Sequence, residues 1–205
     1  MTRPFSVAVY CSASDRVDRA YFEVATELGA AMGTRGWRLV YGAGSVGLMG
    51  AVARATHAAG GQVLGVIPHA LDRLEVTFEE CTELIRVETM RQRKALMEEN
   101  SDAFIALPGG FGTLEEIIEI IVLKQLHYID RPIVFLDVLG YWQPLLALFD
   151  EMIEQRFATP THANLYKSVA TPQEALDYIG NYYPTEAEAP WETVQEDEEL
   201  RTALE

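Results

Sequence analysis

The chain has 205 residues, of which 49% are hydrophobic, and a formal net charge of −15. This length suits one α/β domain over residues 1–183, followed by an acidic, flexible tail or a merely solvated terminus over residues 184–205. The charge argues against a nucleic-acid partner, and no apolar run approaches the ~20 residues that span a bilayer, so no membrane partner is expected. Two cysteines, Cys11 and Cys81, suit a reducing cytoplasm.

Strands and helices are predicted to alternate along the chain. In chain order, the expected elements are strand 5–10, helix 18–35, strand 37–41, helix 46–59, strand 62–67, strand 83–87, helix 90–100, strand 103–107, helix 113–126, strand 131–136, helix 141–155, strand 166–170 and helix 172–182. A polar, irregular loop is expected over residues 71–80. Since the strands are continuous apolar runs, the predicted fold is α/β, with a doubly wound, mostly parallel sheet and helices on both faces.

Three predicted strands end in turns of small residues: 11–14 (CSAS), 42–47 (GAGSVG) and 108–113 (PGGFGT). Ligands of open α/β sheets bind at the carboxyl ends of the strands, so three such turns on one edge predict a binding site.

The turn at 108–113 fits a phosphate best. Gly109, Gly110 and Gly112 let backbone N–H groups approach an anion, and a helix that starts at Thr113 adds about half a positive charge. The Thr113 hydroxyl is a further donor. The alternative is that the glycines only permit a tight turn.

The turn at 42–47 matches G-x-G-x-x-G, a pattern found in dinucleotide sites. The following strand ends Gly-Val-Ile-Pro at residues 65–68 and lacks the acidic residue that would bind a ribose. A dinucleotide is therefore not expected, which leaves close helix packing or contact with a smaller ligand.

Charged residues lie next to the predicted phosphate turn. Thr113 and Glu116 have the spacing of a capping box, so Glu116 is either a cap or a carboxylate placed where a ribose hydroxyl or an attacking water would lie. Arg93 and Lys94 begin the preceding helix, where they either form a solvated basic face or meet the ligand. The histidines and cysteines show no metal-ligand spacing, so no metal is expected. Trp142 and Phe149 are expected to be core or subunit contacts.

Two motifs resemble a known family. Residues 108–116 fit P-G-G-x-G-T-x-x-E, and residues 90–94 (MRQRK) fit M-x-x-R-K. With residues 42–50 (GAGSVGLMG), they resemble the LONELY GUY (LOG) family of cytokinin riboside 5′-monophosphate phosphoribohydrolases, whose bacterial members were often mislabelled lysine decarboxylases. The resemblance covers roughly residues 5–180.

The resemblance implies a Rossmann-like homodimer without a cofactor, which hydrolyses AMP or N6-substituted AMP to free base and ribose 5-phosphate. It maps the catalytic pair onto Arg93 and Glu116. The substrate and phosphate contacts expected from the family and the turns are Ser12, Gly44, Glu75, Met90, Lys94, Gly109, Gly110, Phe111, Gly112, Thr113, Leu114 and Glu115.

Two other functions compete with the hydrolase. One is a non-catalytic nucleotide-binding or carrier protein on the same scaffold. The other is an amino-acid decarboxylase, which needs a lysine to form a Schiff base with pyridoxal phosphate, and only Lys94, Lys124 and Lys167 are available.

Overall fold

The computed structural model describes residues 3–72 and 77–183. In these residues, seven parallel strands form one sheet in the order β4-β3-β2-β1-β5-β6-β7. The strands are β1 (Ser6–Tyr10), β2 (Arg38–Tyr41), β3 (Val63–Pro68), β4 (Glu83–Val87), β5 (Ala103–Ala106), β6 (Ile133–Leu136) and β7 (Lys167–Val169). The predicted α/β class and doubly wound sheet are confirmed.

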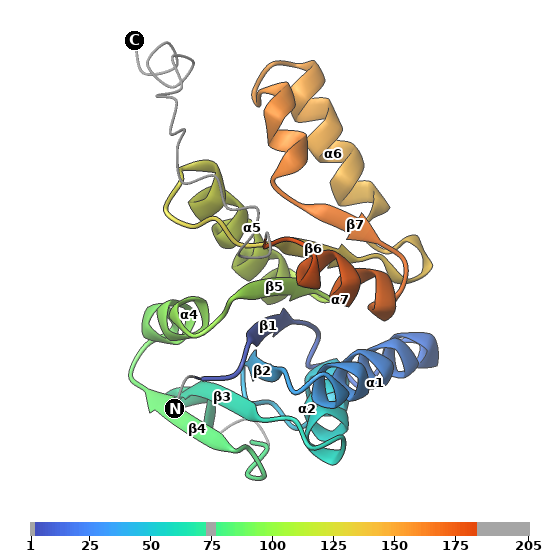
Figure 1. Ribbon diagram of the computed structural model, residues 1–205. Coiled ribbons are helices and arrows are strands. Elements are labelled where there is room, and N and C mark those ends of the chain that lie inside the picture. The colour runs from blue at the N-terminus through green and yellow to red at the C-terminus, as the bar shows by residue number, and fades with distance from the viewer. Residues whose placement is uncertain (1–2, 73–76, 184–205) are drawn as a thin grey trace.

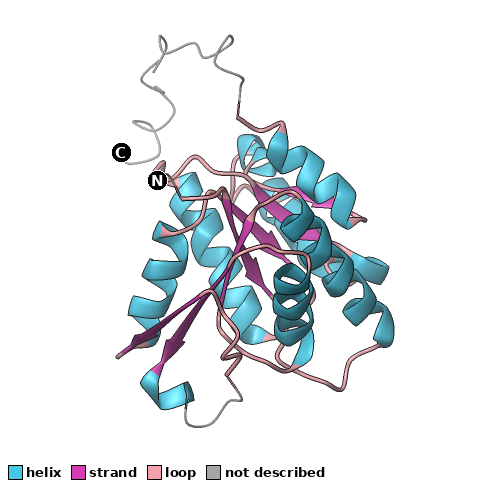
Figure 2. Ribbon diagram, turned by 60° about the horizontal axis from the view of Figure 1, so that its bottom comes forward, coloured by secondary structure: helices cyan, strands magenta, loops and turns pink. Residues whose placement is uncertain are grey.

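Helices cover both faces of the sheet (Figures 1 and 2). They are α1 (Arg19–Thr34), α2 (Gly47–Ala58), α3 (His69–Asp72), α4 (Met90–Glu99), α5 (Phe111–Gln125), α6 (Gln143–Glu154) and α7 (Pro172–Gly180), with 3₁₀ turns η1 (Val138–Gly140) and η2 (Pro160–Asn164). One core cluster joins the strands to α1, α2 and α7, and the other joins them to α4, α5 and α6. Alternate strand residues point to opposite clusters, as the pleat of a strand requires.

Several helix boundaries follow from local capping. Asp18 accepts a hydrogen bond from Ala20 N at the start of α1, and Thr89 forms the predicted capping box with Gln92 at the start of α4. Pro172 lies in the first turn of α7, as predicted. The short helix α3 enters the segment that was predicted to be irregular from residue 71.

The strand order places a topological switch between β1 and β5. The chain winds outward from β1 to β4, then crosses back to β5 and continues to β7 on the other side. The connections that follow β1 and β5 therefore diverge at the carboxyl ends of these two strands, where ligands of open α/β sheets bind. No helix of the described segments combines the length and apolar character that a bilayer crossing requires.

Candidate functional site

The turns after β1 and β5 meet at the switch point. Leu107 N donates to Tyr10 O at 3.0 Å, and Ser12 N donates to Pro108 O at 3.2 Å. The Ser12 carbonyl in turn accepts from Leu48 N (2.9 Å) and Met49 N (3.3 Å) at the start of α2. Backbone hydrogen bonds thus hold the predicted turns together at one edge of the sheet.

The turn after β5 opens into a helix N-terminus with free donors. Gly110 is the N-cap of α5 and makes no side-chain cap, and the first helical amide with an acceptor is Leu114 N, which donates to Gly110 O at 3.0 Å. Within the described segments, the amides of Phe111 and Gly112 have no acceptor. These N–H groups and the helix dipole suit an anion.

Gly110 and Gly112 are not required by the packing of the protein. A Cβ built on either residue meets no heavy atom within 4 Å, and neither has a positive φ. A side chain would therefore fit within the described fold itself. Because Gly110 and Gly112 have no Cβ, a ligand can approach the backbone at these positions.

The predicted start of α5 at Thr113 is wrong. The helix begins two residues earlier, at Phe111, because Gly110 serves as the N-cap. Thr113 is buried inside the first turn, and a Cβ on Gly109 would lie 2.1 Å from Thr113 Oγ1. Thr113 and Glu116 therefore form no capping box, and the capping explanation for Glu116 is removed.

Arg93 is a buried cation with few partners. Its side chain comes from the first turn of α4, and the residue is only 7% exposed. Nη2 donates to Gly42 O at 3.3 Å and Nη1 lies 3.8 Å from Met90 Sδ, whereas Nε is buried without a hydrogen-bond partner in the described protein. A buried, incompletely paired guanidinium is costly, which points to a functional role.

Gly42 makes room for this guanidinium. A Cβ on Gly42 would lie 1.7 Å from Arg93 Nη2 and 2.8 Å from its Cζ. The glycine and its carbonyl thus fix the place of Arg93 at the end of β2. The sequence motif contained Gly42, but only the structure shows its contact with Arg93.

Glu116 lies in a poorly solvated position near Arg93. Burial raises the pKa of its carboxyl to about 7, a shift that Arg93 opposes and Glu115 reinforces. Burial is the largest cause that raises the pKa values of Tyr10 and Cys11, and the charge of Glu116 is the second. The Glu116 charge is thus felt at the end of β1, and its carboxyl has a pKa suited to proton transfer near neutral pH.

Lys94 is held by two carboxylates. Its Nζ bonds to Glu115 and lies 3.0 Å from Glu119 Oε2, one helical turn further along α5. Burial disfavours the Lys94 charge, but the hydrogen bonds to Glu115 and Glu119 outweigh this effect and raise its pKa. Lys94 thus ties α4 to α5, and its charge is already compensated.

The glycine-rich turn after β2 is packed against the protein. A Cβ on Gly47 (φ +62°) would lie 2.4 Å from Ala13 C, and one on Gly50 would lie 2.0 Å from Ser45 O. Ala43 has a positive φ of 63°, which is strained for a side-chain-bearing residue. Of the two explanations that the sequence left open, close packing accounts for these glycines.

A cavity of about 240 Å³ lies beside the glycine turn. Its lining includes the predicted residues Ser12, Gly109 and Gly110. It also includes Tyr21 and Tyr141, which the sequence did not predict to be site residues. Their rings meet edge to face at 6.1 Å between centroids. Neither tyrosine belongs to a motif, so no sequence pattern pointed to them.

The remaining predicted contacts surround this edge. Met90 is 44% exposed beside Arg93, Phe111 is 92% exposed at the first position of α5, and Leu114 is half-buried. Gly44 forms an isolated antiparallel bridge with Thr77. Glu75 and the predicted tail lie outside the described residues.

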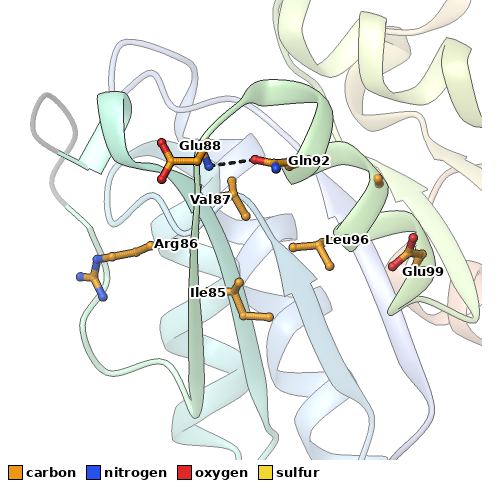
Figure 3. Close-up of a pocket in the computed structure, with 8 residues that line it drawn as sticks. Ile85, Arg86, Val87, Glu88, Gln92, Leu96 and Glu99 are labelled. Atoms are coloured by element: carbon orange, nitrogen blue, oxygen red, sulfur yellow. Dashed lines mark hydrogen bonds between the residues drawn. The ribbon is translucent and has the colours of Figure 1, made fainter.

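A larger groove of about 480 Å³ lies elsewhere, between β4 and α4 (Figure 3). Its lining includes Ile85, Val87 and Leu96, with Gln92 at its edge. The Gln92 side chain is occupied, because its oxygen accepts from Glu88 N at 2.9 Å, as drawn in Figure 3. None of the predicted site residues lines this groove. Across residues 3–72 and 77–183, no cluster of three or more histidine, cysteine or acidic side chains could hold a metal ion.

Comparisons with known proteins show the family to which this chain belongs. The model of a family described as "Possible lysine decarboxylase" matches residues 49–179. The cytokinin riboside 5′-monophosphate phosphoribohydrolase LOG5 of Arabidopsis thaliana is 42% identical over 190 residues, which cover 91% of this chain and 83% of the relative. The probable phosphoribohydrolase LOGL2 of Oryza sativa subsp. japonica is 44% identical over 87% of this chain and 73% of its own length. The chain belongs to the LOG family.

Solved structures support the fold of this LOG family member. The molybdenum cofactor (Moco) carrier protein of Chlamydomonas reinhardtii matches with a TM-score of 0.69 and 21% identity, over 88% of this chain and 98% of its own. The molybdenum cofactor binding protein of Rippkaea orientalis matches over the same shares, with a TM-score of 0.66 and 19% identity. At these identities the likeness shows the shared Rossmann-like architecture alone.

Proposed function

We propose that this LOG family member hydrolyses the N-glycosidic bond of an adenosine 5′-monophosphate, N6-substituted or plain, to free base and ribose 5-phosphate. The observation that carries the proposal is the pairing of an open helix N-terminus with the buried Arg93 and the half-buried Glu116. The amides at Phe111 and Gly112 are free for a phosphate, the half-buried Glu116 lies one turn further along α5, and Arg93 is buried at the end of β2.

The chemistry follows from these groups. Cleavage of the bond builds positive charge on the ribose, and water adds to C1′ as the base leaves. An ionised Glu116 stabilises that charge and accepts a proton from the attacking water, and the departing base takes up one proton, so that the net change is the addition of one water across the bond. Arg93 offers donors that the protein leaves unused, for Glu116 or for the nucleotide. The 5′-phosphate on the glycine turn supplies binding energy remote from the reacting bond.

The relatives support this assignment. LOG5 and LOG1 of Arabidopsis thaliana, at 42% and 40% identity, are both named cytokinin riboside 5′-monophosphate phosphoribohydrolases. This chain has an arginine in M-x-x-R-K and a glutamate in P-G-G-x-G-T-x-x-E, and the fold brings both to one edge of the sheet.

A pyridoxal phosphate enzyme fits the lysines poorly. Lys94 is bound to two carboxylates and its pKa is raised, which disfavours the neutral amine that a Schiff base requires. Lys124 lies at the far end of α5, where Nζ donates to Arg131 O (3.0 Å) and Tyr182 Oη (2.8 Å). Lys167 lies on β7, the edge strand furthest from the glycine turn on that side of the sheet.

The deciding experiment is product analysis. Purified protein is incubated with isopentenyladenosine monophosphate and, separately, with AMP, and the base and sugar phosphate are quantified by chromatography. The proposal expects equimolar free base and ribose 5-phosphate from at least one substrate. Tight nucleotide binding without release of base would favour the carrier alternative.

We also propose a homodimer, with α5 and α6 at its interface. Helix α6 has no buried residue in this chain, although it carries Leu148 and Met152, which are 49% and 38% exposed. An apolar cavity of about 170 Å³ lies between α5 and α6, next to the exposed Val122. A second copy would cover this surface.

Light scattering should give twice the chain mass, and Met152→Asp should give the monomer; a monomeric wild type would contradict the proposal.

A further inference from the structure

In the turn after β5 (residues 108–113), the peptide unit between Gly109 and Gly110 has little intrinsic restraint on its orientation. Gly109 and Gly110 are consecutive, and glycine adopts a wide range of backbone angles. Thr113 prevents a side chain at Gly109, whereas the space around Gly110 is open. The orientation of the Gly109–Gly110 peptide must therefore be set from outside the turn.

One side chain supplies that restraint. The Tyr141 hydroxyl donates to the Gly109 carbonyl at 2.5 Å, across 32 positions of sequence. In a trans peptide the C=O and the following N–H point in opposite directions. By holding Gly109 O, Tyr141 therefore also sets the direction of Gly110 N–H, which is the first amide of the open helix N-terminus.

Tyr141 is itself well anchored. It follows η1, where Leu139 and Gly140 have positive φ values of 56° and 73° and turn the chain sharply. Its ring meets Trp142 at 5.0 Å between centroids, and Trp142 Nε1 donates to Ala106 O at 3.2 Å, at the end of β5. Asp137 holds the loop from inside by accepting from Trp142 N at 2.7 Å. The loop after β6 is thus held together by Asp137 and fastened to the end of β5 by Trp142.

The same tyrosine faces the ligand space. Tyr141 and Tyr21 line the cavity of about 240 Å³ together with Gly109 and Gly110. The hydroxyl is therefore placed between the loop that anchors it and the turn that it holds. No other described side chain donates to the Gly109 carbonyl.

We propose that Tyr141 is a positioning residue of the phosphate site: its hydroxyl holds the Gly109–Gly110 peptide so that the Gly110 amide is ready for the 5′-phosphate. The inference rests on the proposed function for the identity of the anion. It adds a residue from the loop after β6 to a site otherwise built from the turns after β1 and β5 and from α4.

The test compares Tyr141→Phe with wild type and with a matched control, Tyr128→Phe. Both variants keep the ring. Tyr128 is 76% exposed, lies between α5 and β6 at the opposite end of α5, and its hydroxyl bonds to no other described residue. Calorimetry with inorganic phosphate gives the Kd, kinetics with AMP give KM and kcat, and thermal melting gives Tm.

Loss of one such hydrogen bond should raise the phosphate Kd and the nucleotide KM of Tyr141→Phe about fivefold. We expect kcat and Tm to stay near the wild-type values, and Tyr128→Phe to change nothing. An unchanged phosphate Kd in Tyr141→Phe, or a wild type that binds no phosphate, would overturn the inference. So would a large fall in Tm with Kd and kcat changing together, because that pattern marks a purely structural role.

The two proposals fail separately. If wild type binds phosphate through Tyr141 but releases no base, the positioning role stands and the hydrolase proposal falls. If base is released with the same KM in wild type and Tyr141→Phe, the hydrolase proposal stands and the positioning role of Tyr141 falls.

Discussion

The two glycine-rich turns of this sheet look alike in sequence but differ in what surrounds them. In the turn after β2, the fold itself requires glycine at positions 42 and 47, because Arg93 and Ala13 occupy the space that a Cβ would need. In the turn after β5, Gly110 and Gly112 border open space. A glycine that the fold does not need is the stronger sign of a ligand, and the first turn serves mainly to place Arg93 for the second.

The largest expected effect comes from the carboxyl beside the open turn. Glu116→Gln should lower kcat by about 10³-fold, because the amide can neither take a proton nor stabilise positive charge as an anion. Turnover assays with the proposed substrate measure it. Glu27→Gln, an exposed change on α1, is the control. Near wild-type turnover by Glu116→Gln would remove Glu116 from the chemistry.

The next effect tests whether the packed turn acts through Arg93. Gly42→Ala must displace the guanidinium, so kcat/KM should fall by about 10²-fold, the scale expected for a shift of about 1 Å in a catalytic group. Gly180→Ala serves as a control, since the nearest atom to its Cβ is 4.0 Å away. If Gly42→Ala retains full activity, Arg93 is not held as described.

Alanine at one glycine of each turn gives the most direct contrast. Gly112→Ala should weaken phosphate binding about tenfold while leaving the protein as stable or about 0.5 kcal/mol more stable, since alanine favours the helix. Gly47→Ala should lower stability by more than about 1 kcal/mol, because its φ is +62° and Ala13 blocks the side chain. Denaturant titration and calorimetry separate the two, and equal stability losses would erase the distinction.

The smallest expected effect is on stability against pH. The pKa of Glu116 is about 7 in the folded protein and about 4.5 when exposed, so the folded state retains a proton that the unfolded state releases between these values. The free energy of unfolding contributed by Glu116 therefore falls as pH rises from about 4.5 to 7. Glu116→Gln should raise Tm by a few degrees at pH 8 and leave it unchanged at pH 4. A lower Tm at pH 8 would show that the charge stabilises the fold.

The sequence predicted the sheet well because its strands are apolar runs bounded by glycine, proline or caps such as Thr89. The predicted start of α5 was wrong because Gly110, the actual N-cap, has no side chain that could mark it, whereas Thr113 is of a residue type typical of N-caps. The motif residues Arg93 and Glu116 were identified by pattern. Tyr141 and the contact between Gly42 and Arg93 could not be, because each joins elements that are adjacent only after the sheet forms.

The open turn after β5 is proposed to bind the 5′-phosphate of the substrate. The most direct measurement is kcat/KM for AMP against adenosine, in wild type and in Gly112→Ala. Wild type should favour the nucleotide by at least about 10³-fold, the scale of three or four hydrogen bonds to a charged group, and Gly112→Ala should lose about tenfold of this preference. Equal cleavage of nucleotide and nucleoside, or a preference that Gly112→Ala leaves intact, would contradict it.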